Sequence, residues 1–497
     1  MRIILTLVLA LAGGAMADPV VLQGDYQVLQ RGADGTATAA VSCGAPPAGA
    51  TVKHTVYHHG VVVQSGEAKD LQPGGTVQIN GLKTGGPYRI DVVLANDDGT
   101  ETLLKRFDGV LVGDLWVLAG QSNMQGAAPI KEKQPPNPLV NMLGMDNVWK
   151  PAVPPTHRLV ESDARVMKDL LMNRGGFKTE EDILKTREEV RARGEFWGGA
   201  GCDTFFAGWL ARESGVPQGV IPTAFGGTSL GEWDPALLPR GEASLYGNMI
   251  QQIGRAGGRV RGMLWYQGES DASSTDPAVH GTYFDRFKAF AEATRRDSGN
   301  PDMVFITAQL GRVMIMPQEL GPMWGGVRNQ QRRLAAEVPG VRMVPTIDLP
   351  LSDIIHIGWE GHKILGMRMA RIALPLVRDG AEPRRGIEVA SAAFADEGRG
   401  TILVDFDNVA GALRADGLPR GFTMIKKEGD PEFDWFFDIA FDPEKPNRVI
   451  LRCAPVEPGA QVSYAQGLNP VANITDGDGM GLPSFGPIPV APAPAAK

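Results

Sequence analysis

The sequence predicts an α/β protein in which a parallel sheet with helices on both faces is flanked by an N-terminal and a C-terminal β-domain. Three observations predict this. Apolar strand-like runs alternate with helical periodicity between residues 111 and 380. Short β-rich runs separated by Gly, Pro and Asn turns precede and follow that region. The length of 497 residues also suggests about three domains rather than one core.

Residues 1–17 have the pattern of a signal peptide. Arg2 precedes an apolar run at residues 3–12, and Ala15-Met16-Ala17 is a small-residue cleavage site. A membrane anchor is the alternative, but the run is shorter than a bilayer-spanning helix needs. We expect export to a periplasm or the exterior, with no membrane attachment once the signal is removed.

Residues 18–110 are expected to form a β-sandwich. Short β-rich runs lie at 52–56, 60–63, 76–79 and 88–94, with turn residues between them.

Residues 111–380 carry the predicted parallel sheet. Its strands are expected at 115–119, 219–224, 261–266, 303–309 and 342–346, and its helices at 281–296, 326–337 and 358–373. An insertion near 127–200 interrupts this alternation with Pro-rich turns and a charged helical stretch at 180–193. Long loops on a rigid scaffold often shape a binding site, so we expect the insertion beside the strand ends.

Residues 381–487 return to short strands, at 401–406, 448–453 and 461–464, and predict a second β-domain. The Pro/Ala-rich tail, residues 488–497, is expected to be disordered.

Charge and cysteine content exclude several classes of protein. The net charge of −8 comes from well-mixed acidic and basic residues, which argues against nucleic-acid binding. Cys43, Cys202 and Cys453 have no metal-ligand spacing and no neighbouring base. We expect them to be small buried hydrophobic residues.

Ser122 is the sharpest chemical feature. An apolar strand runs into Gly120-Gln121-Ser122-Asn123-Met124, and ligands of open α/β sheets bind at such strand ends. A helix-capping serine is the alternative, and the two roles are compatible because a helix N-terminus offers N–H donors to an oxyanion.

A nucleophilic serine needs a base, and His356 is the best placed of the seven histidines. It follows the strand ending near residue 346, with Asp353 three residues upstream, where the carboxylate could orient the imidazole. His362 is the rival base, but no aspartate is placed equally well beside it.

Two further strand ends could supply oxyanion donors. Gly226-Gly227-Thr228-Ser229 follows one strand, and its glycines allow a close backbone approach. It lacks the pattern of a phosphate-binding loop. Gln267 and Glu269 follow another strand: the amide of Gln267 could donate, and Glu269 could bond to the base or fix the loop.

These blocks together resemble the sialate O-acetylesterase family, a branch of the SGNH hydrolases related to acetylxylan esterases. The matching segments, in order, are Gly-Gln-Ser-Asn-Met, Gly-Gly-Thr-Ser with Glu232-Trp233, Trp-Tyr-Gln-Gly-Glu-Ser-Asp, and Asp-x-x-His. The resemblance implies an SGNH-type, flavodoxin-like sheet and no metal or organic cofactor. It also implies Ser122 as nucleophile, His356 as base, Asp353 as its orienting acid, and Ser122, Gly227 and Gln267 as oxyanion donors.

The expected function is that of a secreted carbohydrate O-acetylesterase, similar to the sialate O-acetylesterases, that acts on an O-acetylated sugar or glycan through an acetyl-enzyme. An acetylxylan or other polysaccharide deacetylase with the same triad is an alternative that the sequence leaves open. A non-catalytic carbohydrate-binding protein is a second alternative, but it would have no need of Ser, His and Asp together at strand ends.

Overall fold

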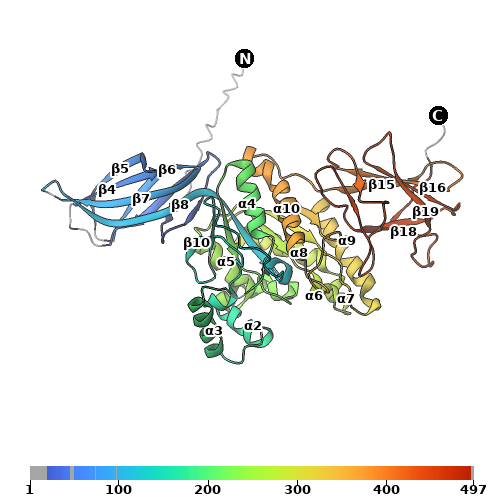
Figure 1. Cartoon of the computed structure of the whole chain (residues 1–497), viewed down its shortest axis with the longest axis horizontal. Helices are drawn as coiled ribbons and strands as arrows, with labels where there is room; N and C mark the ends of the chain where they lie inside the picture. The colour runs from blue at the N-terminus through green and yellow to red at the C-terminus, as the bar shows by residue number, and fades with distance from the viewer. Residues whose placement is uncertain are drawn as a thin grey trace, which may run out of the picture.

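The computed structural model describes residues 19–44, 47, 50–72, 74–96, 98–196 and 198–493. The predicted signal peptide lies outside these residues. The chain is elongated: an N-terminal β-region lies at one end, an α/β region in the middle and a C-terminal β-region at the other end (Figure 1).

The N-terminal region packs two sheets around one apolar cluster. One sheet contains β1 (Val20–Val21), β3 (Thr36–Ser42) and β6 (Thr76–Lys83). The other contains β2 (Val28–Gln30), β4 (Ala50–His58), β5 (Val61–Leu71), β7 (Gly85–Ala95) and the first part of β8 (Glu101–Gly120). Alternate residues of β4, such as Val52 and Val56, are buried, because successive side chains of a strand point to opposite faces of a sheet.

Strand β8 connects the N-terminal sheet to the central sheet. Its first half pairs with β7, and its second half pairs with β11 and β12. The sequence places a domain boundary near residue 110, but β8 runs through that position without a break. The reason is that residues 110–120 are all buried, and the strand passes directly from pairing with β2 and β7 to pairing with β11 and β12.

The central sheet has the order β10-β9-β11-β8-β12-β13-β14, and all its strand pairs are parallel except β10–β9. Its other strands are β9 (Val140–Leu143), β10 (Trp149–Pro151), β11 (Gln218–Pro222), β12 (Gly262–Tyr266), β13 (Val304–Gln309) and β14 (Val341–Pro345). Leaving out the β9–β10 edge, the order is that of a flavodoxin-like sheet, in which ligands bind where the strand order reverses. That point is the carboxyl end of β8, between β11 and β12.

Helices cover both faces of this sheet (Figure 1). On one face α4 (Asp203–Ser214) packs against α10 (Trp359–Asp379), and on the other α8 (Tyr283–Asp297) packs against α9 (Gly321–Glu337), with α5 (Leu245–Arg255) nearby. The shorter helices are α1 (Ser122–Gln125), α6 (Glu269–Ala272), α7 (Pro277–His280), η1 (Leu159–Glu161), η2 (Leu230–Trp233), η3 (Pro235–Ala243) and η4 (Gln318–Leu320).

The insertion near residues 127–200 does more than cover the strand ends. It contributes β9 and β10 to the sheet edge, followed by α2 (Arg165–Arg174) and α3 (Glu180–Ala192). As its charge predicts, α3 is mostly exposed. Thr179 and Asp182 form a capping box at its N-terminus. Helix α2 brings its C-terminal end to the carboxyl edge of the central sheet.

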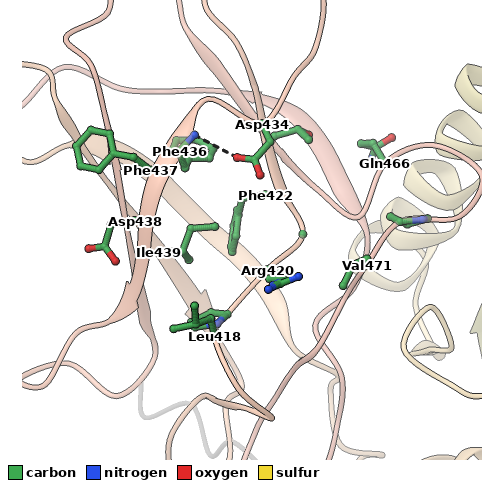
Figure 2. A pocket seen from close by; sticks show the side chains of 14 residues that line it. Leu418, Arg420, Phe422, Asp434, Phe436, Phe437, Asp438, Ile439, Gln466 and Val471 are labelled. Carbon is green, nitrogen blue, oxygen red and sulfur yellow. Dashed lines mark hydrogen bonds between the residues drawn. The ribbon is translucent and has the colours of Figure 1, made fainter.

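The C-terminal region contains three small sheets, ordered β15-β16-β20-β19, β18-β21-β23 and β17-β22. Their strands are β15 (Glu388–Phe394), β16 (Thr401–Asp407), β17 (Arg414–Ala415), β18 (Phe422–Ile425), β19 (Phe436–Phe441), β20 (Arg448–Cys453), β21 (Gln461–Tyr464), β22 (Ile474–Thr475) and β23 (Phe485–Pro489). A hollow opens beside β18 and β19 (Figure 2).

The prediction of a disordered tail from residue 488 is wrong for residues 488–493. Ile488 belongs to β23 and pairs with Val462. Val490 is buried and its N–H donates to the Ala460 carbonyl, while Ala491 bridges to Ala393. These long-range backbone bonds order a segment whose composition alone resembles a linker.

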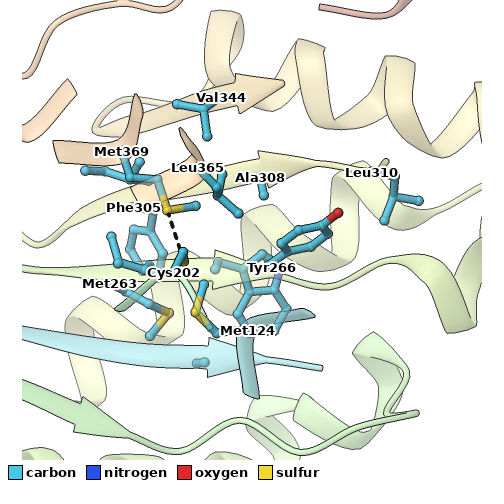
Figure 3. Packing of buried hydrophobic residues seen from close by; sticks show 14 of the residues in the cluster. Met124, Cys202, Met263, Tyr266, Phe305, Ala308, Leu310, Val344, Leu365 and Met369 are labelled. Atoms are coloured by element: carbon cyan, nitrogen blue, oxygen red, sulfur yellow. Dashed lines mark hydrogen bonds between the residues drawn. The ribbon is translucent and has the colours of Figure 1, made fainter. Parts of the chain in front are cut away.

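One apolar core joins the central and C-terminal regions. Figure 3 shows part of it, where Met124, Met263 and Tyr266 pack near Cys202 and Met369. All three cysteines are buried and unpaired, which confirms the prediction for them. Among the described helices, none is both long enough and apolar enough to span a bilayer.

Candidate active site

A cavity of about 720 Å³ opens at the carboxyl ends of β8, β11 and β12. Ser122 and His356 line it, together with Gly227, Glu269 and the α2 side chain Arg174. It lies where the strand order reverses, which is where an open α/β sheet binds ligands. The insertion therefore forms one wall of this cavity, as its length predicts.

The turn that presents Ser122 requires a glycine at the end of β8. Gly120 has φ +133°, and a Cβ there would lie 2.1 Å from the carbonyl oxygen of Tyr266 on β12. Only glycine combines this conformation with so close a backbone approach. The N–H of Gln121 donates to the same Tyr266 carbonyl, and Ser122 then begins α1. The capping position belongs to Gln121, so Ser122 is not the helix cap.

The structure brings Ser122, His356 and Asp353 into one hydrogen-bonded chain. Ser122 Oγ lies 3.0 Å from His356 Nε2, although the two residues are 234 positions apart. His356 Nδ1 lies 2.7 Å from Asp353 Oδ2. With its proton on Nδ1, the ring donates to Asp353 and accepts the Ser122 hydroxyl proton, which is the geometry of an activated serine.

Backbone groups hold Asp353 in place. Its Oδ1 accepts the N–H groups of Ile355 at 2.8 Å and His356 at 2.7 Å. Partial burial raises the pKa of Asp353, but these N–H groups and the His356 ring outweigh it, so the pKa lies below its ordinary value. The carboxylate is therefore charged and fixed at neutral pH, although its side chain is 49% exposed.

The glycine loop after β11 places a backbone N–H beside Ser122. A Cβ on Gly226 would lie 3.4 Å from the Cβ of Ser122, so the loop touches the nucleophile. The Gly226 N–H donates to the Gln125 side chain, whereas within the described chain the Gly227 N–H has no acceptor. Gly227 has φ +71°, a conformation that favours glycine. Its N–H and that of Ser122, in the first turn of α1, are free to bind an oxyanion.

Arg174 of α2 anchors this loop, and no local pattern in the sequence indicated it. Its Nη1 donates to the Gly227 carbonyl at 2.9 Å, and its Nη2 lies 2.9 Å from Glu232 Oε1. Glu232 in turn accepts the backbone N–H of Ser229 at 2.9 Å. One arginine from the insertion thus ties both ends of the glycine loop.

The prediction that Gln267 donates directly to the oxyanion is wrong. The side chain is fully buried, and its Nε2 donates to Asp271 Oδ2 at 2.6 Å and to the Thr228 carbonyl at 3.1 Å. It does not line the cavity. Gln267 instead holds the glycine loop from behind, because Thr228 directly follows Gly227.

Glu269 acts on the site indirectly, through Asn123. Its Oε1 accepts from the amide of Asn123 at 2.8 Å, and Asn123 Oδ1 accepts the N–H of Ile357, next to His356. Burial raises the pKa of Glu269, while the Asn123 amide opposes that shift. Both ring nitrogens of His356 already have other partners, so Glu269 fixes the histidine loop rather than bonding to the base.

The rival histidine is not placed for catalysis. His362 is fully buried on α10, and neither ring nitrogen has a partner in the described chain. Burial lowers its pKa to about 3, and burial does the same to His157. Both rings are therefore neutral at pH 7. Within the described ranges, no group of three or more His, Cys, Asp and Glu side chains is arranged to hold a metal ion.

A family model described as carbohydrate esterase, sialic acid-specific acetylesterase matches residues 112–375. The chain belongs to this family. The match covers the central sheet, the glycine loop and the loop that carries Asp353 and His356. Membership confirms the resemblance seen in the sequence and makes the chain a hydrolase of carboxylic esters.

Relatives of this carbohydrate esterase agree with the assignment. A probable carbohydrate esterase of Arabidopsis thaliana is 27% identical over 267 residues, which are 52% of this chain and 90% of that protein. The sialate O-acetylesterases of Pongo abelii and Homo sapiens are each 24% identical over 240 residues. That match covers 45% of this chain and 43% of each of them, so the chain matches less than half the length of these two proteins.

A solved structure shows that the fold of this esterase is shared over nearly the whole chain. A carbohydrate acetylesterase from Xanthomonas citri superposes with a TM-score of 0.61 at 22% identity. The match covers 94% of this chain and 98% of that chain. The SGNH-type arrangement of the central sheet is therefore common to both.

Proposed function

We propose that the chain removes O-acetyl groups from carbohydrates, with Ser122 as nucleophile, His356 as base and Asp353 as the acid that orients it. One observation carries this proposal. Ser122 Oγ is hydrogen-bonded to His356 Nε2 inside an open cavity, and His356 Nδ1 is bonded to a fixed carboxylate. Each group lies within the distance that proton transfer needs.

The reaction proceeds in two steps. His356 Nε2 takes the Ser122 proton as Oγ bonds to the ester carbonyl carbon, and the charged imidazole is stabilised by Asp353. The backbone N–H groups of Ser122 and Gly227 bind the oxyanion. When the intermediate collapses, the C–O bond to the sugar breaks and His356 gives its proton to the leaving sugar oxygen. Water then attacks the acetyl carbonyl as His356 takes its proton; when the bond to Ser122 Oγ breaks, His356 returns that proton to Oγ and acetate leaves.

An acetylated sugar suits the chemistry of the cavity. Its lining combines apolar side chains such as Leu171 and Ile355 with the polar groups of Ser270, Ser273 and Arg174. Pockets for small ligands commonly pair an apolar wall with a few polar groups that fix orientation. Family membership supports a carbohydrate acetyl ester, and the human and orangutan relatives are named sialate O-acetylesterases.

Acetate release from a panel of acetylated glycans tests the proposal. The panel contains O-acetylated sialic acid, acetylated xylan and an aryl acetate, and the control is the Ser122→Ala chain. We expect acetate from the aryl ester and from at least one glycan, and none above background from the control. Acetate release by the Ser122→Ala chain at the native rate would refute the mechanism. Release from the aryl ester alone would refute the carbohydrate substrate.

We also propose that the chain is exported through its N-terminal signal, residues 1–17, and acts outside the cytoplasm. Mass spectrometry of the protein secreted by an expression host tests this. A mature N-terminus at Asp18 is expected, whereas an uncleaved chain that remains in the cytoplasm would contradict it.

A further inference from the structure

A second hollow lies in the C-terminal β-region, away from the catalytic cavity. It has a volume of about 510 Å³ and is bordered by β18, β19, the segment before β18 and the segment after β21. Figure 2 shows Phe422 and Ile439 near its centre, with Leu418, Phe437 and Val471 around them. The volume is in the range of pockets that hold small ligands.

The rim of this hollow exposes large apolar side chains. Phe437 is 74% exposed, Leu418 is 72% exposed and Val471 is 62% exposed, and all three line the same hollow. Single exposed apolar residues are common, but several gathered around one concavity mark a binding surface. The floor beneath them is packed, because Phe422 is 1% exposed and its ring contacts Tyr464 at a tilt and Phe485 edge-on.

Polar groups stand between these apolar side chains. The Arg420 guanidinium forms no ion pair with a described carboxylate, and it is the Arg420 backbone N–H that donates to Asn473. Asp434 uses one carboxylate oxygen to accept the Phe436 N–H at 3.1 Å, and its other oxygen accepts no hydrogen bond from the described residues. The hollow thus offers cationic donors and an anionic acceptor beside apolar and aromatic faces.

A pyranose ring matches this combination. Its C–H faces are apolar and pack on aromatic or aliphatic side chains, while its hydroxyls both donate to carboxylates and accept from guanidinium groups. A hydrophobic peptide would leave Arg420 and Asp434 without partners, which costs free energy when they are desolvated. The mixed lining therefore favours a sugar over an apolar protein segment.

The hollow is linked to the catalytic cavity through two backbone hydrogen bonds. Leu468, in the segment that borders the hollow, accepts the N–H of Val313 at 2.9 Å. The next residue, Met314, donates its N–H to the Ile354 carbonyl at 2.8 Å. Ile354 lies between Asp353 and Ile355 in the catalytic loop. The segment with Val313 and Met314 therefore connects the segment that borders the hollow to the catalytic loop.

Exposed apolar side chains lie at the second of these two backbone bonds. Ile315 is 69% exposed, Met314 is 53% exposed and Ile354 is 47% exposed. Ile355 itself lines the catalytic cavity.

We propose that the hollow lined by Leu418, Arg420, Asp434 and Phe437 is a second carbohydrate-binding site. It holds pyranose rings of the same polysaccharide whose acetylated unit enters the catalytic cavity. This inference rests on the proposed function for the identity of the polymer. Binding at a second point raises the effective concentration of the acetyl group at Ser122 without any new contact there.

A glycan array probed with the full-length Ser122→Ala chain tests binding directly. The array carries xylan, xyloglucan, mannan, pectin and sialylated glycans. The variants are the double substitution Leu418→Ala/Phe437→Ala and the single substitution Arg420→Ala. Val61→Ala is the matched control, because Val61 is 65% exposed on β5, and Figure 1 shows β5 at the opposite end of the chain from β18 and β19. Binding to at least one polysaccharide should weaken tenfold or more in both variants and stay unchanged in the control.

Kinetics of the chain with Ser122 intact separate this inference from the proposed function. The substrate is the acetylated form of the polysaccharide that the chain binds on the array. The KM of the double variant for this substrate should be about tenfold higher than that of the native chain, while its kcat/KM for an aryl acetate stays within twofold of the native value. If the native chain and the double variant had equal KM values for the polymer, or if both variants still bound the glycan as the native chain does, the second site would be refuted. The esterase mechanism would be unaffected. Loss of aryl acetate hydrolysis in Ser122→Ala tests the mechanism alone.

A second copy of the chain is the competing occupant of the hollow. Analytical ultracentrifugation of the native chain and the double variant distinguishes it. A native dimer that the double variant dissociates, with glycan binding unchanged, would assign the hollow to self-association and overturn the proposal. A native sedimentation coefficient that the substitutions do not change, together with weaker glycan binding, is the result that we expect.

Discussion

Replacing Arg174 by alanine should slow the reaction, although Arg174 takes no direct part in the chemistry. Arg174 Nη1 donates to the Gly227 carbonyl at 2.9 Å, and the N–H of the same glycine is a proposed oxyanion donor. Without this bond the loop can rotate away from Ser122. Hydrogen bonds to charged groups contribute about 1.5–3 kcal/mol. Because the Arg174 side chain is 40% exposed, solvent screening reduces this to about 1 kcal/mol, which corresponds to roughly a fivefold loss in rate.

Steady-state kinetics on an aryl acetate measure this effect. We expect kcat to fall about fivefold in Arg174→Ala with little change in KM. The kcat of Arg174→Lys should lie between those of the native chain and Arg174→Ala, because lysine lacks the planar fork that reaches both Gly227 and Glu232. Arg165→Ala is the control: it lies at the other end of α2, is 55% exposed and pairs with Asp169 and Glu180. If Arg174→Ala matched Arg165→Ala in kcat, or raised only KM, the positioning role would be refuted.

Three further predictions concern charge in and around the site. Asp353→Asn should lower kcat about a hundredfold or more, since the imidazole loses its orienting charge, and native kcat in the variant would remove Asp353 from the triad. Burial raises the pKa of Glu269, so the native chain loses stability as the pH rises above the ordinary glutamate pKa of 4.5 toward that raised pKa. Glu269→Gln keeps an acceptor for Asn123, so its Tm should lack this decline and its kcat should stay within about threefold; a hundredfold loss of kcat would instead give Glu269 a direct role. His157 and His362 have a pKa of about 3 when folded and 6.5 when unfolded, so the stability they contribute is present above pH 6.5 and is lost as the pH falls toward 3. Each contributes about 1.4 kcal/mol per pH unit, and Tm measured from pH 7 to 5 should fall less steeply in His362→Leu; parallel curves would contradict the neutral state of the buried ring.

Local sequence pattern was enough to find the residues that meet at the proposed triad. Ser122 follows a Gly-ended strand, and Asp353 and His356 share one tight loop, so short-range rules identify each part. Their meeting across 234 positions follows from the strand order, which places β8 in the middle of the sheet. The parallel sheet itself was predictable, because strands buried on both faces are continuous apolar runs.

Other features depended on contacts that no local pattern records. Arg174 reaches Gly227 from a helix of the insertion, 53 positions away. The amide of Gln267 turns away from the cavity because Asp271 and the Thr228 carbonyl accept from it. Strand β8 continues through the expected domain boundary, and residues 488 and 489 pair with β21, since both features depend on partners far away in the sequence.

Covalent labelling by a fluorophosphonate tests the central claim most directly, because the reagent reacts only with an activated serine. Peptide mass spectrometry of the native chain should find one phosphonate on Ser122, with labelling abolished in Ser122→Ala and slowed at least a hundredfold in His356→Ala. A label on another serine, or labelling of Ser122 at the native rate in His356→Ala, would contradict the account of how this site works.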